Sequence, residues 1–112
     1  MTIDERTANA LLTQFNQSQI YHDNAPEQGD YPLVTYTDIS ETPALHADNK
    51  LYAKSYVIRV TIATNGNAGI NELKEKVYTC MTEAGFMWED TNKIRDNNIY
   101  YTAMDFSYGE LV

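Results

Sequence analysis

Two histidine–aspartate pairs are the residues of this chain whose types best suit chemistry. His22 is followed directly by Asp23, and His46 is separated from Asp48 by one residue. Imidazole nitrogens and carboxylate oxygens bind Zn²⁺ and similar cations, so the two pairs could form a metal site if their loops met. Neither pair has the spacing that places two ligands on one face of a helix, and Asp beside His is common in an acidic segment. The pattern favours surface polar residues and leaves a metal site as the alternative.

Motifs typical of enzymes give no support for catalysis. Residues 65–69 contain two glycines but no lysine, and they fit a strand-to-helix turn better than a phosphate-binding loop. No serine lies in a G-x-S-x-G motif. Cys80, the one cysteine, falls beside the apolar stripe of a predicted helix, where a thiol is more often a small packing residue than a nucleophile. The sequence therefore predicts a protein that is not an enzyme and that uses no cofactor.

Charge is distributed unevenly along the chain. Residues 1–49 carry eight acidic residues and one basic residue, Arg6, whereas residues 50–112 carry eight acidic and seven basic residues. Nucleic-acid binding needs clustered Lys and Arg, and anionic membranes repel an acidic surface, so neither partner is expected. A solvated acidic face is the simplest interpretation. The alternative is a contact with a basic partner or with the basic edge of a neighbouring subunit.

Two amphipathic helices are predicted from spacing. The first spans about residues 4–16 and is capped by Asp4, with apolar side chains at Ala8, Leu11, Leu12 and Phe15. The second runs from residue 67 or 68 to 84, and Gly85 follows it as a left-handed C-terminal cap. Its apolar stripe consists of Ile70, Leu73, Val77, Met81 and Ala84.

Strands are predicted between and after the helices. The clearest covers residues 51–63, where Ile58, Val60 and Ile62 alternate with polar positions. Others are residues 20–22 and 32–39, and a final pair, 86–89 and 99–108, joined by a polar loop over residues 90–98. With 43% apolar residues, the chain of 112 residues is expected to form a single domain over residues 1–112. The expected fold class is α+β, a mostly antiparallel sheet of four to five strands with two helices packed on one face.

A long loop is predicted between the two central strands, over residues 40–50. It contains Pro43 and small apolar side chains where a loop without function would be polar, and long loops in small domains are usually functional or disordered. We therefore expect an interface that uses Thr42, Pro43, Ala44, Leu45, His46, Ala47 and Asp48.

Five segments carry a resemblance to a known family. They are the strand Tyr31-Pro-Leu-Val-Thr-Tyr36, the segment Pro43-Ala-Leu-His-Ala-Asp48, the long strand ending near Ala63, the helix end Glu83-Ala-Gly-Phe86 and the final strand over residues 100–106. In this order, and over nearly the whole chain, they resemble the tail-completion proteins of long-tailed bacteriophages, especially those of Gram-positive hosts. These proteins are also called tail-terminator or head–tail joining proteins.

The resemblance implies a structural role. Such proteins are small α+β domains without catalytic residues that assemble as a ring, typically hexameric, at the head-proximal end of the tail tube. They stop tube growth and dock the head. The implied partners are further copies of this chain, the tail tube protein and the head-connector protein, and the implied location is the virion tail after synthesis in the host cytoplasm. The alternatives are a head-side connector stopper, or a small ligand- or metal-binding regulatory domain that uses His22, Asp23, His46 and Asp48.

Overall fold

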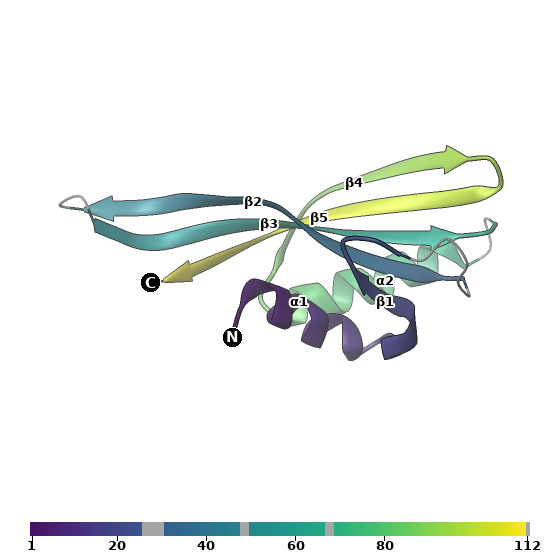
Figure 1. The fold of residues 1–112 in the computed structure, drawn as a ribbon, viewed down its shortest axis with the longest axis horizontal. Helices are drawn as coiled ribbons and strands as arrows, with labels where there is room; N and C mark the ends of the chain where they lie inside the picture. Colours follow the sequence, from purple (N-terminus) through teal and green to yellow (C-terminus); the bar gives the residue numbers. More distant parts are fainter. Residues whose placement is uncertain (26–30, 48–49, 67–68, 112) are drawn as a thin grey trace.

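A five-stranded sheet with both helices on one face makes up the structure (Figure 1). The computed structural model describes residues 1–25, 31–47, 50–66 and 69–111. The elements in chain order are α1 (Ile3–Leu12), a 3₁₀ turn (Gln17–Gln19), β1 (Ile20–His22), β2 (Leu33–Ala47), β3 (Lys50–Thr64), α2 (Ile70–Glu83), β4 (Met87–Asp96) and β5 (Ile99–Leu111). The strand order is β1-β2-β3-β5-β4, with β1 parallel to β2 and all other neighbours antiparallel. The predicted α+β class is confirmed.

The core lies between the helices and one face of the sheet. Ile58, Val60 and Ile62 of β3 are fully buried or nearly so, as their alternation predicts. β5 adds Met104 and Phe106, which lie directly opposite Val60 and Ile58 in the antiparallel register. The helices complete the same cluster with Leu11, Val77 and Met81, among other residues. Both helices therefore attach to the sheet through one continuous apolar layer.

The N-cap of the first helix lies two residues earlier than its sequence suggests, and the helix begins at Ile3. Thr2 is the N-cap, because its hydroxyl accepts a hydrogen bond from the Glu5 backbone N–H (3.1 Å) and the Glu5 side chain reaches back to the Thr2 backbone N–H. This reciprocal capping box satisfies two backbone donors at once, which a cap at Asp4 does not. The prediction of Asp4 as N-cap is therefore wrong, and so is the predicted end, since α1 stops at Leu12.

The end of the second helix agrees with its sequence. Gly85 has a φ of 95°, in the left-handed region that favours glycine. Its N–H donates to the carbonyl of Thr82, and the N–H of Phe86 donates to the carbonyl of Met81. This pair of hydrogen bonds is the Schellman arrangement, which satisfies carbonyls that the helix itself leaves free. Phe86 is thereby turned into the core, where it is 3% exposed.

The predicted loop over residues 40–50 is wrong, because β2 continues as a strand to Ala47 and pairs with β3 down to Lys50. Three register shifts along β2, the first between Asp38 and Ser40 and the others around Leu45, adapt the strand to Pro43. Regular pairing with the alternating residues of β3 satisfies the backbone groups that a loop would leave to water. The loop-like composition of residues 40–47 therefore gave no indication that they pair as a strand with β3.

The predicted polar loop over residues 90–98 is wrong for the same reason. β4 runs to Asp96, and the turn is confined to Asn97, which has a φ of 55°, and Asn98. β4 is an edge strand whose side chains are nearly all exposed, so it needs no apolar residues to pair with β5.

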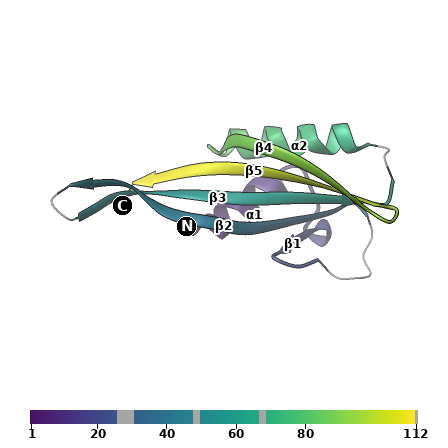
Figure 2. The ribbon, with the colours of Figure 1, turned by 90° about the horizontal axis from the view of Figure 1, so that it is seen from above.

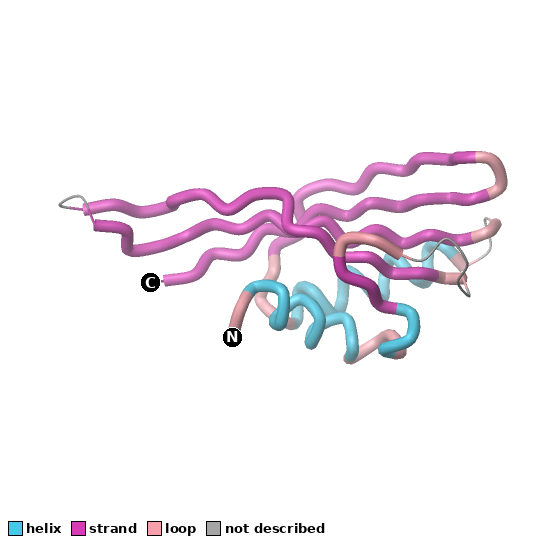
Figure 3. The backbone as a smooth tube through the Cα atoms, in the orientation of Figure 1, coloured by secondary structure: helices cyan, strands magenta, loops and turns pink. Residues whose placement is uncertain are grey.

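Long hairpins make the molecule elongated, with extents of 53 × 24 × 23 Å. The end of the β2–β3 hairpin projects beyond the helices in one direction, together with the C-terminal end of β5, and the β4–β5 hairpin projects the opposite way (Figures 1 and 2). Figure 3 shows that the helices accompany only the middle of the sheet and the end where β2 begins. We call residues 40–47 of β2 and their partners 50–57 of β3 the arm.

Two isoleucines on neighbouring strands test this division between core and arm. Ile58 is fully buried, whereas Ile39 at the base of the arm is 44% exposed. We expect Ile58→Ala to lower the free energy of unfolding by about 2–5 kcal/mol, because it leaves a cavity in the core. Ile39→Ala should cost about 0.5 kcal/mol or less. Urea denaturation followed by circular dichroism measures both, and equal losses would contradict the assignment of the core to the helix-facing side alone.

Candidate functional site

The arm contains the residues that the sequence suggests as an interface. Thr42, Pro43 and Ala44 are exposed in β2. The backbones of Leu45, His46 and Ala47 pair with β3, but their side chains, like all of Asp48, lie outside the described part of the structure. Their role as an interface stays a prediction.

No described side chain of the arm, in residues 40–44 and 53–57, is buried. β5 accompanies β3 as far as Ala53, and an ion pair between Lys54 and Glu41 (3.1 Å) joins the two strands of the arm across one face. Leu111 of β5, opposite Ala53, is 81% exposed. The arm is therefore held by backbone pairing and this ion pair. Among its described side chains Tyr56 packs against the core, and most of the others are available to a partner.

The outer edge of the arm has features that discourage uncontrolled pairing. Among the described residues, β1 pairs with β2 only at Val34 to Tyr36, so β2 is an edge strand beyond that point. Pro43 lacks an N–H, and the register shifts twist the edge. Proline and bulges on edge strands are common protections against aggregation. A partner would therefore meet the side chains of the arm more readily than its backbone edge.

A second candidate site, made of polar side chains, lies where α1, β1 and β2 meet. We call Asp4, His22, Asp23 and Asp38 the His22 corner. The Nε2 atom of His22 lies 3.5 Å from Asp4 Oδ1 and 3.5 Å from Asp23 Oδ1. The ligand atoms of Asp4, His22 and Asp38 all lie within 4.8 Å of one another. The His22 ring stacks on Tyr36, with centroids 4.8 Å apart and planes 17° apart.

Electrostatic crowding is strong in the His22 corner. Burial, then the hydrogen bond and charge of the neighbouring Asp4 carboxylate, raise the pKa of Asp38 to about 6, while His22 opposes the shift. Burial and the same carboxylates also raise the pKa of Tyr36. One oxygen of Asp4, Oδ1, is buried without a hydrogen-bond partner. The corner thus concentrates negative charge that the described protein groups only partly neutralise.

The metal site that the sequence left as an alternative is not formed by both histidine–aspartate pairs. His22 and Asp23 do lie together, but His46 is ten residues farther along β2 than Tyr36, the residue that pairs with His22. At about 3.3 Å per residue, that is on the order of 33 Å along the strand. The alternative in which the two pairs meet does not hold for His46, because its segment is a projecting strand and not a loop that folds back. Sequence spacing gave no signal for Asp4 and Asp38, which come from a helix and another strand.

The sheet face opposite the helices carries one structured ion pair. Arg59 Nε donates to Asp105 Oδ1 (2.8 Å) and its second nitrogen to Oδ2 (3.2 Å), across the β3–β5 register. This charge-assisted bidentate geometry also raises the pKa of Arg59. Both groups are satisfied by each other, so the pair fixes strand register and offers little to a ligand.

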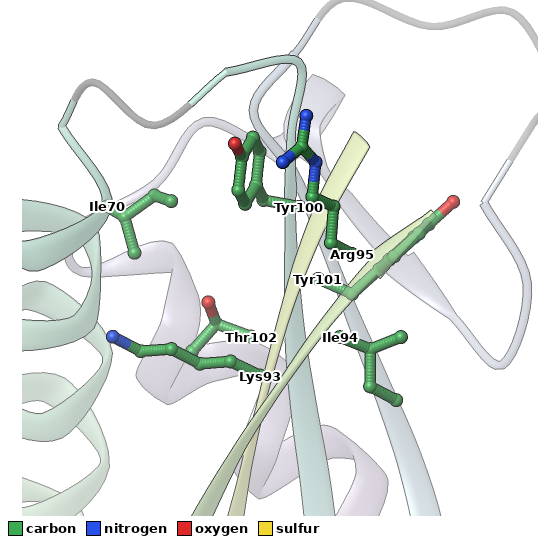
Figure 4. A pocket seen from close by; sticks show the side chains of 7 residues that line it. All are labelled: Ile70, Lys93, Ile94, Arg95, Tyr100, Tyr101 and Thr102. Carbon is green, nitrogen blue, oxygen red and sulfur yellow. The ribbon is translucent and has the colours of Figure 1, made fainter. Parts of the chain in front are cut away.

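A groove runs between α2 and the edge strand β4. Tyr78 and Trp88 are 44% and 48% exposed there, and the Trp88 indole N–H donates to Thr91 Oγ1 (2.8 Å). A separate pocket of about 220 Å³ lies near the start of α2 and is also lined by β4 (Figure 4). In Figure 4, Lys93 points toward α2, and the Arg95 guanidinium lies over the Tyr100 ring, 5.2 Å from its centroid. This side of β4 is therefore aromatic and cationic.

Cys80 is a packing residue, as its position in the sequence indicates. It is 2% exposed, and its thiol donates to the carbonyl of Val77. Burial raises the pKa of the Cys80 thiol to about 11. A nucleophilic cysteine needs a lowered thiol pKa and access to solvent.

Comparisons with known proteins identify the fold and nothing further. Neither a protein-family model nor a curated protein matches this chain. One of the solved structures that match, whose title states no function, aligns with 97% of this chain and 89% of its own, with a TM-score of 0.59 and 7% sequence identity. At that identity the likeness extends to the fold alone. In the described residues, no helix is long and apolar enough to cross a membrane.

The thiol of Cys80 gives a direct test of the core. At pH 8 we expect Ellman's reagent to react with the native protein at least about 100-fold more slowly than with the unfolded protein, because burial suppresses the thiolate. Because the folded pKa is raised, the thiol contributes stability that is present below the unfolded pKa and is lost as pH rises through about 11. Lys76→Cys in a Cys80→Ser background, on an exposed position of α2, is the control and should react rapidly. Equal rates for the two native proteins would contradict the burial of Cys80.

Proposed function

We propose that this chain is a non-enzymatic virion assembly protein, a tail-completion protein that forms a ring on the head-proximal end of a phage tail tube and joins the tube to the head. The resemblance in sequence order suggests this role. The observation that carries it is the arm, an extension of the sheet that no helix covers. Its partners would be further copies of this chain, the tail tube protein and the head-connector protein.

The arm is difficult to explain as part of a solitary domain. β2 and β3 have 15 residues each, against a usual strand length of about five or six residues. Their inner halves contribute to the core, and no described side chain of the arm is fully buried, although Tyr56 at its base packs against the core. Ordering a strand costs conformational entropy that apolar burial normally offsets. A contact between subunits would supply that burial in the assembled state.

Charge placement favours contacts between opposite edges of neighbouring copies. The His22 corner, with three carboxylates, lies at the β1–β2 edge, whereas Lys93 and Arg95 lie on the helix-facing side of β4, at the other edge. A head-to-tail contact that joins one edge to the other would bring unlike charges together. Because such a contact uses two different surfaces, it generates a closed ring when the rotation between copies closes.

Oligomeric mass is the first test. Light scattering of the purified protein from micromolar to millimolar concentration should show a mass of about six times 12.8 kDa, alone or in the presence of isolated tail tubes. Leu45→Asp places a charge in the arm, where desolvation on assembly would be costly, so we expect a folded monomer and at least a tenfold weaker assembly.

Leu12→Asp is the matched control, because Leu12 is 45% exposed on α1, in the helical layer and not on the arm. It should assemble as the parent protein does. Circular dichroism should report the same fold for both variants. Normal rings from Leu45→Asp would remove the arm from the interface, and a strict monomer that ignores tail tubes would refute the proposed function itself.

A further inference from the structure

We propose that the His22 corner is a Zn²⁺ site in which Asp4, His22 and Asp38 bind the ion and Asp23, beside His22, completes the carboxylate shell. The proposal does not depend on the assembly role. It rests on the spacing of the ligand atoms, on an unsatisfied oxygen and on the way three elements hold these side chains.

Ligand spacing is the first argument. The two distances of 3.5 Å from His22 Nε2, to Asp4 Oδ1 and to Asp23 Oδ1, are longer than good N–H···O hydrogen bonds, which are about 2.7–3.2 Å. They match a different geometry. Two ligands at about 2.0–2.2 Å from a tetrahedral zinc ion are roughly 3.3–3.5 Å apart. The ligand atoms of Asp4, His22 and Asp38 all lie within 4.8 Å of one another, so a modest side-chain adjustment brings these three onto one ion, and Asp23 can complete the shell.

An unsatisfied oxygen is the second argument. Asp4 Oδ1 is buried and has no hydrogen-bond partner among the described residues, although it faces His22 Nε2. A buried carboxylate oxygen without a partner is costly, and here a second carboxylate, from Asp38, lies within 4.8 Å of the Asp4 ligand atom. A divalent cation would satisfy the oxygen and neutralise the repulsion between the two carboxylates in one step.

The ligands are held by the backbone and by packing. Asp4 lies in the first turn of α1, which the Thr2 capping box fixes. The Asp23 N–H donates to the carbonyl of Tyr36 (2.9 Å), and the Tyr36 ring stacks on His22. Such supporting contacts orient the side chains that bind the metal and raise the affinity for it. The side chains of His22 and Asp23 are 42% and 56% exposed, so an ion can enter and water can complete its shell.

The donor set favours a transition-metal ion such as Zn²⁺ over the alkaline-earth cations. One imidazole nitrogen with carboxylate oxygens suits Zn²⁺, whereas Ca²⁺ and Mg²⁺ prefer shells made of oxygen alone. Since binding would join α1, β1 and β2, zinc should stabilise the folded chain through mass action.

The two histidines of the chain provide a matched test. Calorimetric titration of the full chain with ZnCl₂, together with thermal melts, should show one zinc bound per chain and a rise in melting temperature that grows with zinc concentration. His22→Gln should weaken binding at least tenfold and abolish the rise. His46→Gln, which removes the other imidazole from the distant arm, should bind within twofold of the parent protein.

Further measurements separate loss of binding from loss of fold. Circular dichroism should be unchanged in His22→Gln; if that variant misfolds, Asp23→Asn on its exposed residue takes its place and should also weaken binding. Zinc should shift the ¹⁵N resonance of His22 Nε2 in the parent protein. The proposal is overturned by no melting shift at 1 mM ZnCl₂, by equal loss in His46→Gln, or by Ca²⁺ binding as tightly as Zn²⁺.

Discussion

β3 is the strand on which the rest of the structure depends, because it pairs with β2 along one edge and with β5 along the other. Its core residues Ile58, Val60 and Ile62 face the helices, whereas Ala63, which is also buried, alternates to the other face, opposite Leu33 of β2. Since both helices cover the first of these faces, the other face of the sheet is left mainly to polar pairs such as Arg59 and Asp105. One-sided burial thus separates a stable centre from surfaces that are available for contacts.

Local patterns predicted the elements that make this core. Alternation identified the inner part of β3 and of β5, and helical spacing identified α2 together with its cap at Gly85. These predictions succeed because the burial of each of these residues depends only on its own helix or strand and on which face of that element meets the core. The predicted start of α1 failed because two N-terminal candidates, Thr2 and Asp4, compete, and only Thr2 has a glutamate three positions later to complete a capping box.

The arm and the His22 corner could not be predicted in the same way. Residues 40–47 have no alternation and contain Pro43, so nothing local marks them as a strand; their pairing depends on a partner strand that is already in place. Asp4, His22 and Asp38 are far apart in the sequence and meet only because β1 lies parallel to β2 under the start of α1. Residues that are brought together only by tertiary contacts have no characteristic spacing in the sequence.

The two features are adjacent in the fold. Asp38 of the His22 corner is the last residue of β2 before the register shift at which the arm begins. A bound cation that connects Asp38 to α1 and β1 would therefore also fix the base of the arm. Without it, repulsion among the three carboxylates would weaken this attachment. The charge state of the corner is thus positioned to set how firmly the arm is oriented, since the arm itself has no helix against which to pack. The ring contacts proposed for the arm would then depend on the corner, which itself lies at the edge proposed to meet Lys93 and Arg95 of a neighbouring copy.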